Sequence, residues 1–168
     1  KGIGVIYDVV FNHKMGADET ERVRVHRVNP DNREEIDPET FEATAHTRFI
    51  FPGRQGRHSE FVWAAKSFSG VDHIEDPHET GVVNDYDDGW SVEVGEEFGN
   101  FDYLMGSDIE FRNKAVYEEL KHWGRWLMGE LPCAGFRLDA VKHIPAWFYR
   151  DWIGHMRENA GKDLFVVA

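Results

Sequence analysis

The fold of this chain is decided by the stretch Gly135-Phe136-Arg137-Leu138-Asp139-Ala140-Val141-Lys142-His143. Apolar residues alternate there with Arg137, Asp139 and Val141, and this period of two predicts a short strand with both charged side chains on one face. An arginine two residues from an aspartate can hold that carboxylate ionised and oriented, as a carboxylate nucleophile requires. An ordinary ion pair at the end of a strand is the alternative interpretation.

The composition indicates a globular domain that is unsuited to binding polyanions. The chain has 168 residues, of which 41% are apolar and 14% aromatic, enough to build a core of ordinary size. Nineteen Lys and Arg against thirty-one Asp and Glu leave a formal net charge of -12. Because this charge repels phosphate backbones and anionic lipid, we expect no nucleic-acid partner and no membrane partner. The surplus carboxylates can hold a hard cation such as calcium.

The cysteine content and the two ends of the chain bear on its cellular context. Cys133 is the single cysteine, which excludes an internal disulfide framework and fits a reducing compartment. The sequence contains no run of about 18 apolar residues and no signal peptide at its start. We expect a cytoplasmic location, which the single cysteine fits, with secretion as the alternative. The chain opens at Lys1 and closes on an apolar run, so we expect an internal segment of a longer protein.

The first strand places polar residues at its carboxyl end. Residues 3–10 are apolar and β-branched nearly throughout, which suits a parallel strand buried on both faces. Asp8, Asn12 and His13 then fall at or just beyond the end of this strand, where α/β folds place their chemistry. A turn capped by aspartate and asparagine side chains is the alternative.

Residues 14–109 lack the alternation of helices and strands that a simple barrel shows. A structureless connection of this length is improbable in a compact domain, so we expect an excursion with its own core. Runs of period two predict short antiparallel strands around Val23, Val25, Phe49 and Phe51.

An acidic loop follows this excursion and suggests a metal site. Asn100, Asp102, Asp108 and Glu110 lie within one short segment. Closely spaced oxygen ligands suit calcium, which takes six to eight oxygens in irregular geometry. The spacing differs from that of an EF-hand, and an acidic loop without metal is the alternative.

The remainder of the chain alternates helix and strand. Residues 111–130 carry an apolar stripe at helical spacing, and a second helix is expected from Pro145 to Gly161. The run from Leu164 to Ala168 is expected to be the next strand. Three parallel strands with crossover connections indicate part of an α/β barrel or of an open doubly wound sheet.

Together these motifs resemble the alpha-amylase family of glycoside hydrolases. The resemblance is carried by Asp8-Val9-Val10-Phe11-Asn12-His13, then Asn100-Phe101-Asp102-Tyr103-Leu104-Met105, then the stretch 135–143. The middle motif is most similar to the liquefying and intracellular bacterial alpha-amylases. The motifs run over nearly the whole chain in the family's order.

The resemblance implies an α/β fold, as part of a (β/α)8 TIM barrel. Residues 1–13 would form barrel strand three, and residues 14–109 an inserted B domain rich in β-strand and loop. Residues 110–168 would run from barrel helix three to strand five. Both ends of the chain would then lie inside the barrel.

The resemblance also implies the catalytic roles. Asp139 would be the nucleophile of a retaining mechanism, attacking the anomeric carbon to form a covalent glycosyl-enzyme. Arg137 would orient Asp139, Asp8 would support Arg137, and His13 would hydrogen-bond the sugar in the cleaved subsite.

The remaining site residues are assigned in the same way. Lys142 and His143 would contact sugars on the leaving-group side. Calcium (Ca2+) would be bound by Asn12, Asp102, Asp108 and the backbone carbonyl of His143, tying the excursion to the barrel.

The function implied is that of an endo-acting alpha-1,4-glucan hydrolase acting on starch, glycogen or maltodextrins. The family's general acid is a Glu expected directly after Ala168, and its third carboxylate is expected near strand seven. A retaining glycosidase needs both an acid and a nucleophile, so the chain alone is expected to be inactive. A transglycosylase of the same family and a non-catalytic glucan-binding or transporter-associated barrel are the alternatives.

Overall fold

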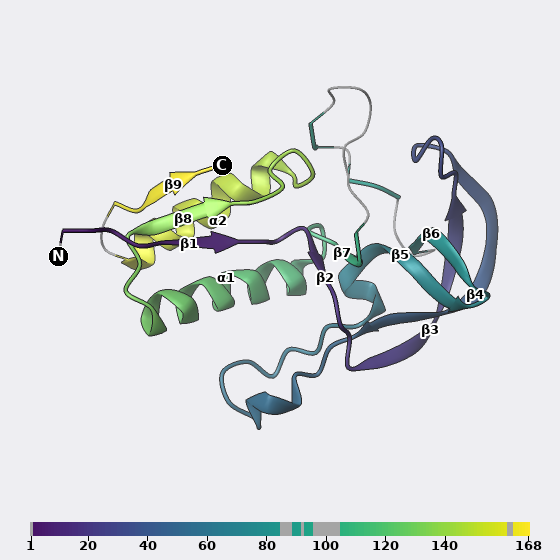
Figure 1. The fold of residues 1–168 in the computed structure, drawn as a ribbon, viewed down its shortest axis with the longest axis horizontal. Coiled ribbons are helices and arrows are strands. Elements are labelled where there is room, and N and C mark those ends of the chain that lie inside the picture. Colours follow the sequence, from purple (N-terminus) through teal and green to yellow (C-terminus); the bar gives the residue numbers. More distant parts are fainter. Residues whose placement is uncertain (1, 85–88, 92, 96–104, 161–162) are drawn as a thin grey trace.

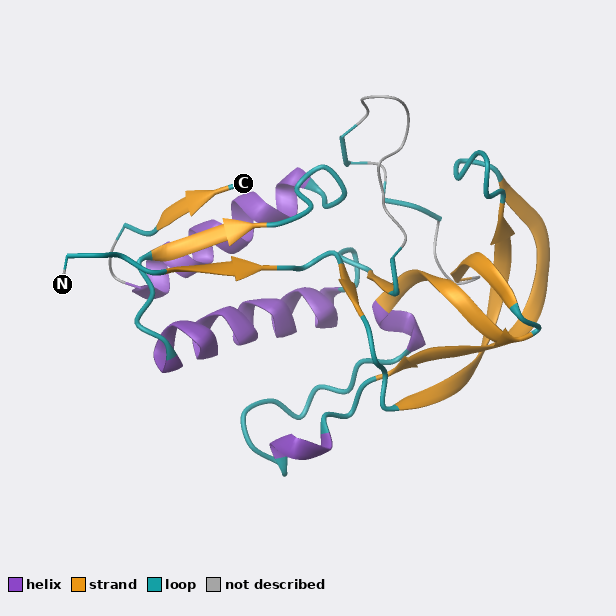
Figure 2. Cartoon of the chain, in the orientation of Figure 1, coloured by secondary structure: helices purple, strands orange, loops and turns teal. Residues whose placement is uncertain are grey.

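A parallel sheet with helices forms one end of the molecule, and an antiparallel sheet forms the other (Figures 1 and 2). This arrangement is that of a computed structural model, which describes residues 2–84, 89–91, 93–95, 105–160 and 163–168. Within these residues the parallel sheet has three strands and the antiparallel sheet has six. The sequence-based expectation of a mixed α/β chain with a β-rich excursion is confirmed at this level.

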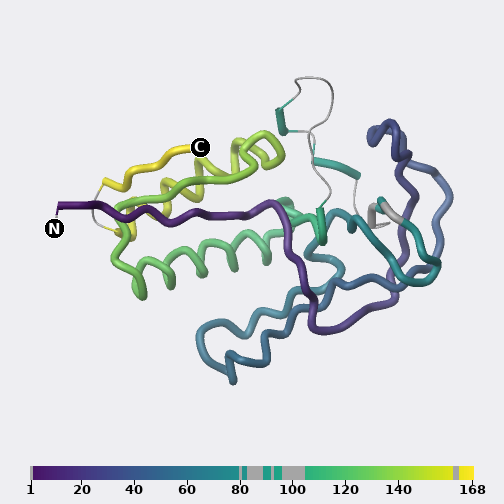
Figure 3. Tube along the Cα trace, in the orientation of Figure 1, coloured from purple at the N-terminus to yellow at the C-terminus, as the bar shows by residue number. Residues whose placement is uncertain are grey.

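The parallel sheet brings together segments from both ends of the sequence. Its strands are β1 (Ile6–Val9), β8 (Gly135–Leu138) and β9 (Phe165–Val167), in the order β1-β8-β9. The chain leaves this sheet after β1, passes through the antiparallel sheet and returns into the first helix (Figure 3). Strand β8 therefore pairs directly with β1, although more than a hundred residues separate them.

Helices α1 (Lys114–Glu130) and α2 (Ala146–Ala160) pack against the parallel sheet. The predicted apolar stripe of α1 is confirmed at Val116, Leu120 and Leu127, which are buried. The helix begins at Lys114 rather than at Phe111, because the side chain of Asn113 caps it by accepting a hydrogen bond from the amide of Ala115. Among the described residues, neither helix is long and apolar enough to cross a membrane.

The shared core of this end is strongly aromatic. Phe136 of β8 and Trp152 of α2 are fully buried, with ring centroids 5.1 Å apart in an edge arrangement. The indole nitrogen of Trp152 donates to the carbonyl of Leu120, so this tryptophan also links α2 to α1. Close packing of this kind fixes the helices relative to the strand ends where chemistry is expected.

The antiparallel sheet has a separate core. Its strands are β2 (His13–Lys14), β3 (Glu19–Val28), β4 (Ile36–Arg48), β5 (Phe68–Asp76), β6 (Glu79–Asn84) and β7 (Ser107–Ile109). Their order is β2-β7-β5-β4-β3-β6. Buried side chains from β3, β4, β5 and β6 form the core: Val23, Val25, Ala43, Ala45, Val71, Ile74 and Val82. The strand expected around Val23 and Val25 is therefore confirmed.

The prediction of a strand around Phe49 and Phe51 is wrong. Phe49 makes an isolated bridge to Trp63, and Phe51 has a φ of 48°, which is incompatible with a strand. A 3-10 turn, η1 (Pro52–Arg54), follows at once, and a second, η2 (Ala65–Ser67), precedes β5. The proline and the glycine after Phe51 favour this turn over the alternating pattern before it.

Strand β1 also differs from expectation. Residues 3–10 were expected to be buried on both faces, but Val5 is 66% exposed and Val10 is 51% exposed, whereas Val9 is buried. The physical reason is its position, because among the described strands β1 pairs only with β8 and lies at the edge of the sheet.

Gly124 lies where α1 crosses α2, and we predict that Gly124→Ala destabilises the fold by about 2 kcal/mol. A Cβ atom at this position would lie 2.6 Å from the sulfur of Met156 and 2.8 Å from Cζ2 of Trp152. Both side chains are fully buried and cannot move aside freely. The free energy of unfolding in urea is the measurement.

Gly129 in the same helix is the matched control. A Cβ atom there would meet nothing within 4 Å, so Gly129→Ala should raise stability by about 0.5–1 kcal/mol through helix propensity. Equal stabilities for the two variants would contradict the packing argument.

Candidate active site

Three charged side chains meet at the carboxyl ends of β1 and β8. The strand register sets Asp8 opposite Arg137. Nη1 of Arg137 donates to Asp8 at 2.8 Å from Oδ1 and 3.1 Å from Oδ2, and it lies 2.8 Å from Oδ1 of Asp139. One guanidinium thus holds two carboxylates. The three side chains are 39–59% exposed, so a dissolved ligand can reach them.

The electrostatics of this cluster keep its centre charged. Hydrogen bonds to Asp8 first, and then to Asp139, raise the pKa of Arg137 above its ordinary value. The guanidinium therefore stays protonated, and its charge offsets the repulsion between the two carboxylates. The arrangement presents Asp139 as an oriented and solvent-accessible carboxylate, the type of group that can act as a nucleophile.

The backbone of Asp139 is held from both sides. Its amide donates to the carbonyl of Val9 on the neighbouring strand at 3.0 Å. Its carbonyl accepts a hydrogen bond of 2.8 Å from the hydroxyl of Tyr149, a buried residue of α2. The next residue, Ala140, has a φ of 55°, which turns the chain away from the strand direction. The sequence motifs did not identify Tyr149, because no local pattern links a helix residue to a carbonyl ten positions earlier.

His13 lies in β2, shortly after the end of β1. Burial lowers the pKa of His13, while the negative charges of Asp139 and Asp72 oppose this shift. His13 is therefore neutral at neutral pH and can both donate and accept a hydrogen bond.

Lys142 and His143 lie in the loop that follows β8. Lys142 is exposed and His143 is half-buried, and the amide of His143 donates to the carbonyl of Ala140 at 2.9 Å. The carbonyl of Lys142 accepts a hydrogen bond of 2.9 Å from the amide of Gly95. This bond connects the loop after β8 to the excursion, so both parts of the chain border the same region.

Two of the residues expected to bind calcium are in contact. The side-chain amide of Asn12 donates to Oδ1 of Asp108 at 3.3 Å, and both residues are buried. Oδ2 of Asp108 accepts a hydrogen bond of 2.6 Å from the hydroxyl of Ser69. Asp102 lies outside the residues that the structure describes.

The donor set at this position fits a hard cation in part. Amide and carboxylate oxygens are the ligands that calcium prefers, and a buried carboxylate is costly unless it is neutralised or hydrogen-bonded. In the described part of the chain, no group of three or more His, Cys, Asp or Glu side chains is arranged to hold a metal ion. The calcium site thus stays a prediction.

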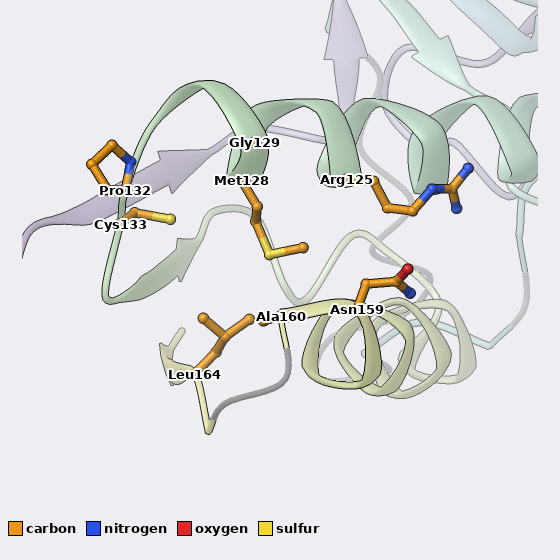
Figure 4. A pocket seen from close by; sticks show the side chains of 8 residues that line it. All are labelled: Arg125, Met128, Gly129, Pro132, Cys133, Asn159, Ala160 and Leu164. Carbon is orange, nitrogen blue, oxygen red and sulfur yellow. The ribbon is translucent and has the colours of Figure 1, made fainter.

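A separate cavity of about 410 Å³ lies at the opposite ends of the strands (Figure 4). It is bounded by the carboxyl-terminal halves of α1 and α2 and by residues that precede β8 and β9. Its lining consists of Arg125, Met128, Gly129, Pro132, Cys133, Asn159, Ala160 and Leu164. None of the charged residues of the candidate active site lines it.

The fold and the charged cluster are typical of α/β proteins that carry an active site at the carboxyl ends of parallel strands. Asp8, Arg137 and Asp139 gather where parallel strands end, and this edge is where α/β barrels and open α/β sheets carry their catalytic groups.

Comparison with known proteins narrows this class. The chain is 59% identical to the cytoplasmic alpha-amylase of Escherichia coli K12, over 99% of this chain and 34% of that protein. It is 45% identical to the glucan 1,4-alpha-maltohexaosidase of Bacillus sp. strain 707, over 99% of this chain and 33% of that protein. It is 44% identical to the alpha-amylase of Bacillus licheniformis, over 100% of this chain and 33% of that protein. No protein-family model matches the chain.

Identity at this level along the whole chain shows that it belongs to the alpha-amylase family. The resemblance inferred from the sequence motifs is therefore confirmed. The chain spans about a third of the length of these relatives.

Next to His13, Lys14 is a half-buried cation that the sequence motifs did not single out. Its Nζ atom lies 4.2 Å from the ring centroid of Trp63 and 5.5 Å from that of Phe51. Burial, followed by repulsion from Arg54, lowers the pKa of Lys14 to about 8, while Glu119 opposes the shift. In the unfolded chain a lysine has a pKa of about 10.4.

We predict that Lys14 makes folding stability rise with pH between about 8 and 10.4. In this window the unfolded chain binds more protons than the folded protein, so each rise in pH favours the folded form. The unfolding free energy of the wild type, minus that of Lys14→Met, should increase by about 3 kcal/mol from pH 7 to pH 10.5.

The measurement is urea unfolding across this pH range. Lys66→Met is the matched control, because it removes the same charge from an exposed side chain. A difference between the wild type and Lys14→Met that stays level with pH would show that the prediction is wrong.

Proposed function

We propose that the full-length protein is an endo-acting alpha-1,4-glucan hydrolase that cleaves starch, glycogen or maltodextrins with retention of configuration. The observation that carries this proposal is the pairing of Arg137 with both Asp8 and Asp139 at the strand ends. The family membership of the chain supports it, because three of its relatives are named alpha-amylases.

In the proposed mechanism, Asp139 attacks the anomeric carbon and forms a covalent glycosyl-enzyme, which water then hydrolyses. Arg137 keeps the attacking carboxylate directed at the sugar, and Asp8 holds Arg137 in place. A retaining glycosidase also needs a second carboxyl group about 5 Å from the nucleophile, as general acid. The family resemblance assigns this acid to a Glu directly after Ala168.

The substrate contacts are proposed on the same basis. His13 hydrogen-bonds the sugar in the cleaved subsite, and its lowered pKa supports a neutral ring that can do so at neutral pH. Lys142 and His143 contact sugars on the leaving-group side, from the loop after β8.

For the architecture, we propose that the parallel strands are strands three to five of a (β/α)8 barrel. Residues 1–13 are then strand three, residues 14–109 the B domain, and residues 110–168 the segment from helix three to strand five. Exposed apolar side chains just before β1 support this, since Ile3 is 85% and Val5 66% exposed. Such side chains are suited to packing against a further part of a barrel.

A cytoplasmic location is proposed from the name of the Escherichia coli relative, the cytoplasmic alpha-amylase. Assay of glucan hydrolysis in separated cytoplasmic and secreted fractions tests it, and activity confined to the secreted fraction would contradict it.

We predict that Asp139→Asn in the full-length protein lowers kcat on soluble starch by several orders of magnitude, because the amide cannot act as the covalent nucleophile. The fold should persist, since the side chain is exposed and its contact to Arg137 is at the surface. Initial rates of reducing-sugar release and a thermal melt are the measurements.

Asp151→Asn is the control, because Asp151 is an exposed aspartate of α2 that pairs with Lys121 rather than with Arg137. Near-normal turnover by Asp139→Asn would contradict the assignment.

If the wild type lengthens maltodextrins instead of shortening them, the transglycosylase alternative holds. Glucan binding without turnover by the wild type would indicate the non-catalytic alternative.

We further propose a calcium site formed by Asn12, Asp102, Asp108 and the backbone carbonyl of His143. The buried contact between Asn12 and Asp108 supports two of these ligands, and the family resemblance supplies the other two. Bound calcium would neutralise the buried carboxylate and tie the excursion to the end of β1.

We predict that a chelator lowers the melting temperature of the full-length protein, and that added Ca2+ restores it, because a ligand that binds only the folded state stabilises it. Asp108→Asn should largely abolish this response, since it removes a charged ligand. Scanning calorimetry with and without calcium is the measurement. A wild-type melting curve that is unchanged by calcium removal would refute the site.

A further inference from the structure

The hydroxyl of Tyr149 reaches the backbone of the residue proposed as nucleophile. It donates a hydrogen bond of 2.8 Å to the carbonyl oxygen of Asp139. Tyr149 is in the first turn of α2, which begins shortly after the loop that follows β8. The bond therefore connects the helix directly to the end of the catalytic strand.

The packing around Tyr149 fixes its position. The centroid of its ring lies 5.6 Å from that of Phe148 and 6.4 Å from that of Phe11, and the residue is 8% exposed. Burial, and then the negative charge of Asp139, raise the pKa of Tyr149, so the hydroxyl keeps its proton and remains a donor.

The peptide that Tyr149 contacts is in an unfavourable conformation. It joins Asp139 to Ala140, whose φ of 55° lies in the left-handed region, where an alanine is strained. Such a conformation persists when surrounding contacts hold it. The amide of Asp139 is already held by Val9, and Tyr149 holds its carbonyl.

We propose that Tyr149 is a positioning residue for the nucleophile, whose hydroxyl fixes the Asp139–Ala140 peptide and thereby the direction in which the Asp139 carboxylate points. The inference rests on the proposed function, in which Asp139 attacks the sugar. A carboxylate that must reach an anomeric carbon in line loses rate when its backbone rotates, even if substrate still binds. The expected effect therefore falls on kcat rather than on KM.

The test is Tyr149→Phe in the full-length protein, which removes one oxygen atom and keeps the ring. We expect kcat on maltodextrins to fall about tenfold, because the backbone that carries the reacting carboxylate loses one hydrogen bond. KM should change by less than about twofold. The rate of covalent labelling by a mechanism-based fluorosugar should fall by the same factor as kcat.

Tyr117→Phe is the matched control. Tyr117 of α1 also packs against Phe148, with ring centroids 6.1 Å apart, but it lies outside the proposed catalytic machinery. Its kcat and its labelling rate should equal those of the wild type.

Hydrogen exchange measured by mass spectrometry provides a readout that does not depend on turnover. In Tyr149→Phe, the segment 139–143 should exchange faster, because the turn at Ala140 loses a contact that holds it, while the later turns of α2 should be unchanged. Faster exchange throughout α2 would show that the hydroxyl only supports the fold, and would overturn the proposal.

The outcomes separate this proposal from the proposed function. An active wild type with an unchanged kcat in Tyr149→Phe would overturn the positioning role and leave the function of Asp139 intact. A wild type that neither hydrolyses glucans nor becomes labelled on Asp139 would overturn both. A lower melting temperature with unchanged kinetics would also contradict positioning.

Discussion

The arrangement of the site depends on the ion pair that Arg137 makes with Asp8 across two parallel strands. The two residues are 129 positions apart in the sequence, and their contact requires β1 and β8 to pair in one register. Ion pairs between exposed groups add little to stability. The pair of Arg137 and Asp8 is therefore important for orienting side chains rather than for holding the fold together. A guanidinium anchored by Asp8 presents its charge to Asp139 in one direction, and this is the condition for a directed nucleophile.

The excursion takes part in this site and is more than an attached domain. Phe49, Trp63 and Phe68 belong to the same buried cluster as the strands and helices of the parallel sheet. The amide of Gly95 bonds to the loop after β8, and Asp72 of β5 influences the protonation of His13. The excursion therefore contributes packing, a backbone contact and charge to the strand ends. The spatial relation of the two sheets is as important for the site as the residues of either one.

Sequence reasoning succeeded where the determining contacts are local. The apolar stripe of α1 and the alternation around Val23 predicted elements that the structure contains, because both patterns depend on neighbours within one element. It failed at Phe51, where a following proline and glycine redirect the chain, and at Val5, whose burial depends on a neighbouring strand. Asp102, part of the expected calcium site, lies outside the described residues, so the structure does not address that ligand.

The sequence by itself determined which charged groups are available, which segments become strands or helices, and, through its motifs, the family to which the chain belongs. Only the tertiary structure decided that Arg137 is shared between two carboxylates and that Tyr149 holds the carbonyl of Asp139. The reason is physical. Periodicity records the contacts a residue makes within its own element, whereas register and helix placement follow from packing the whole core.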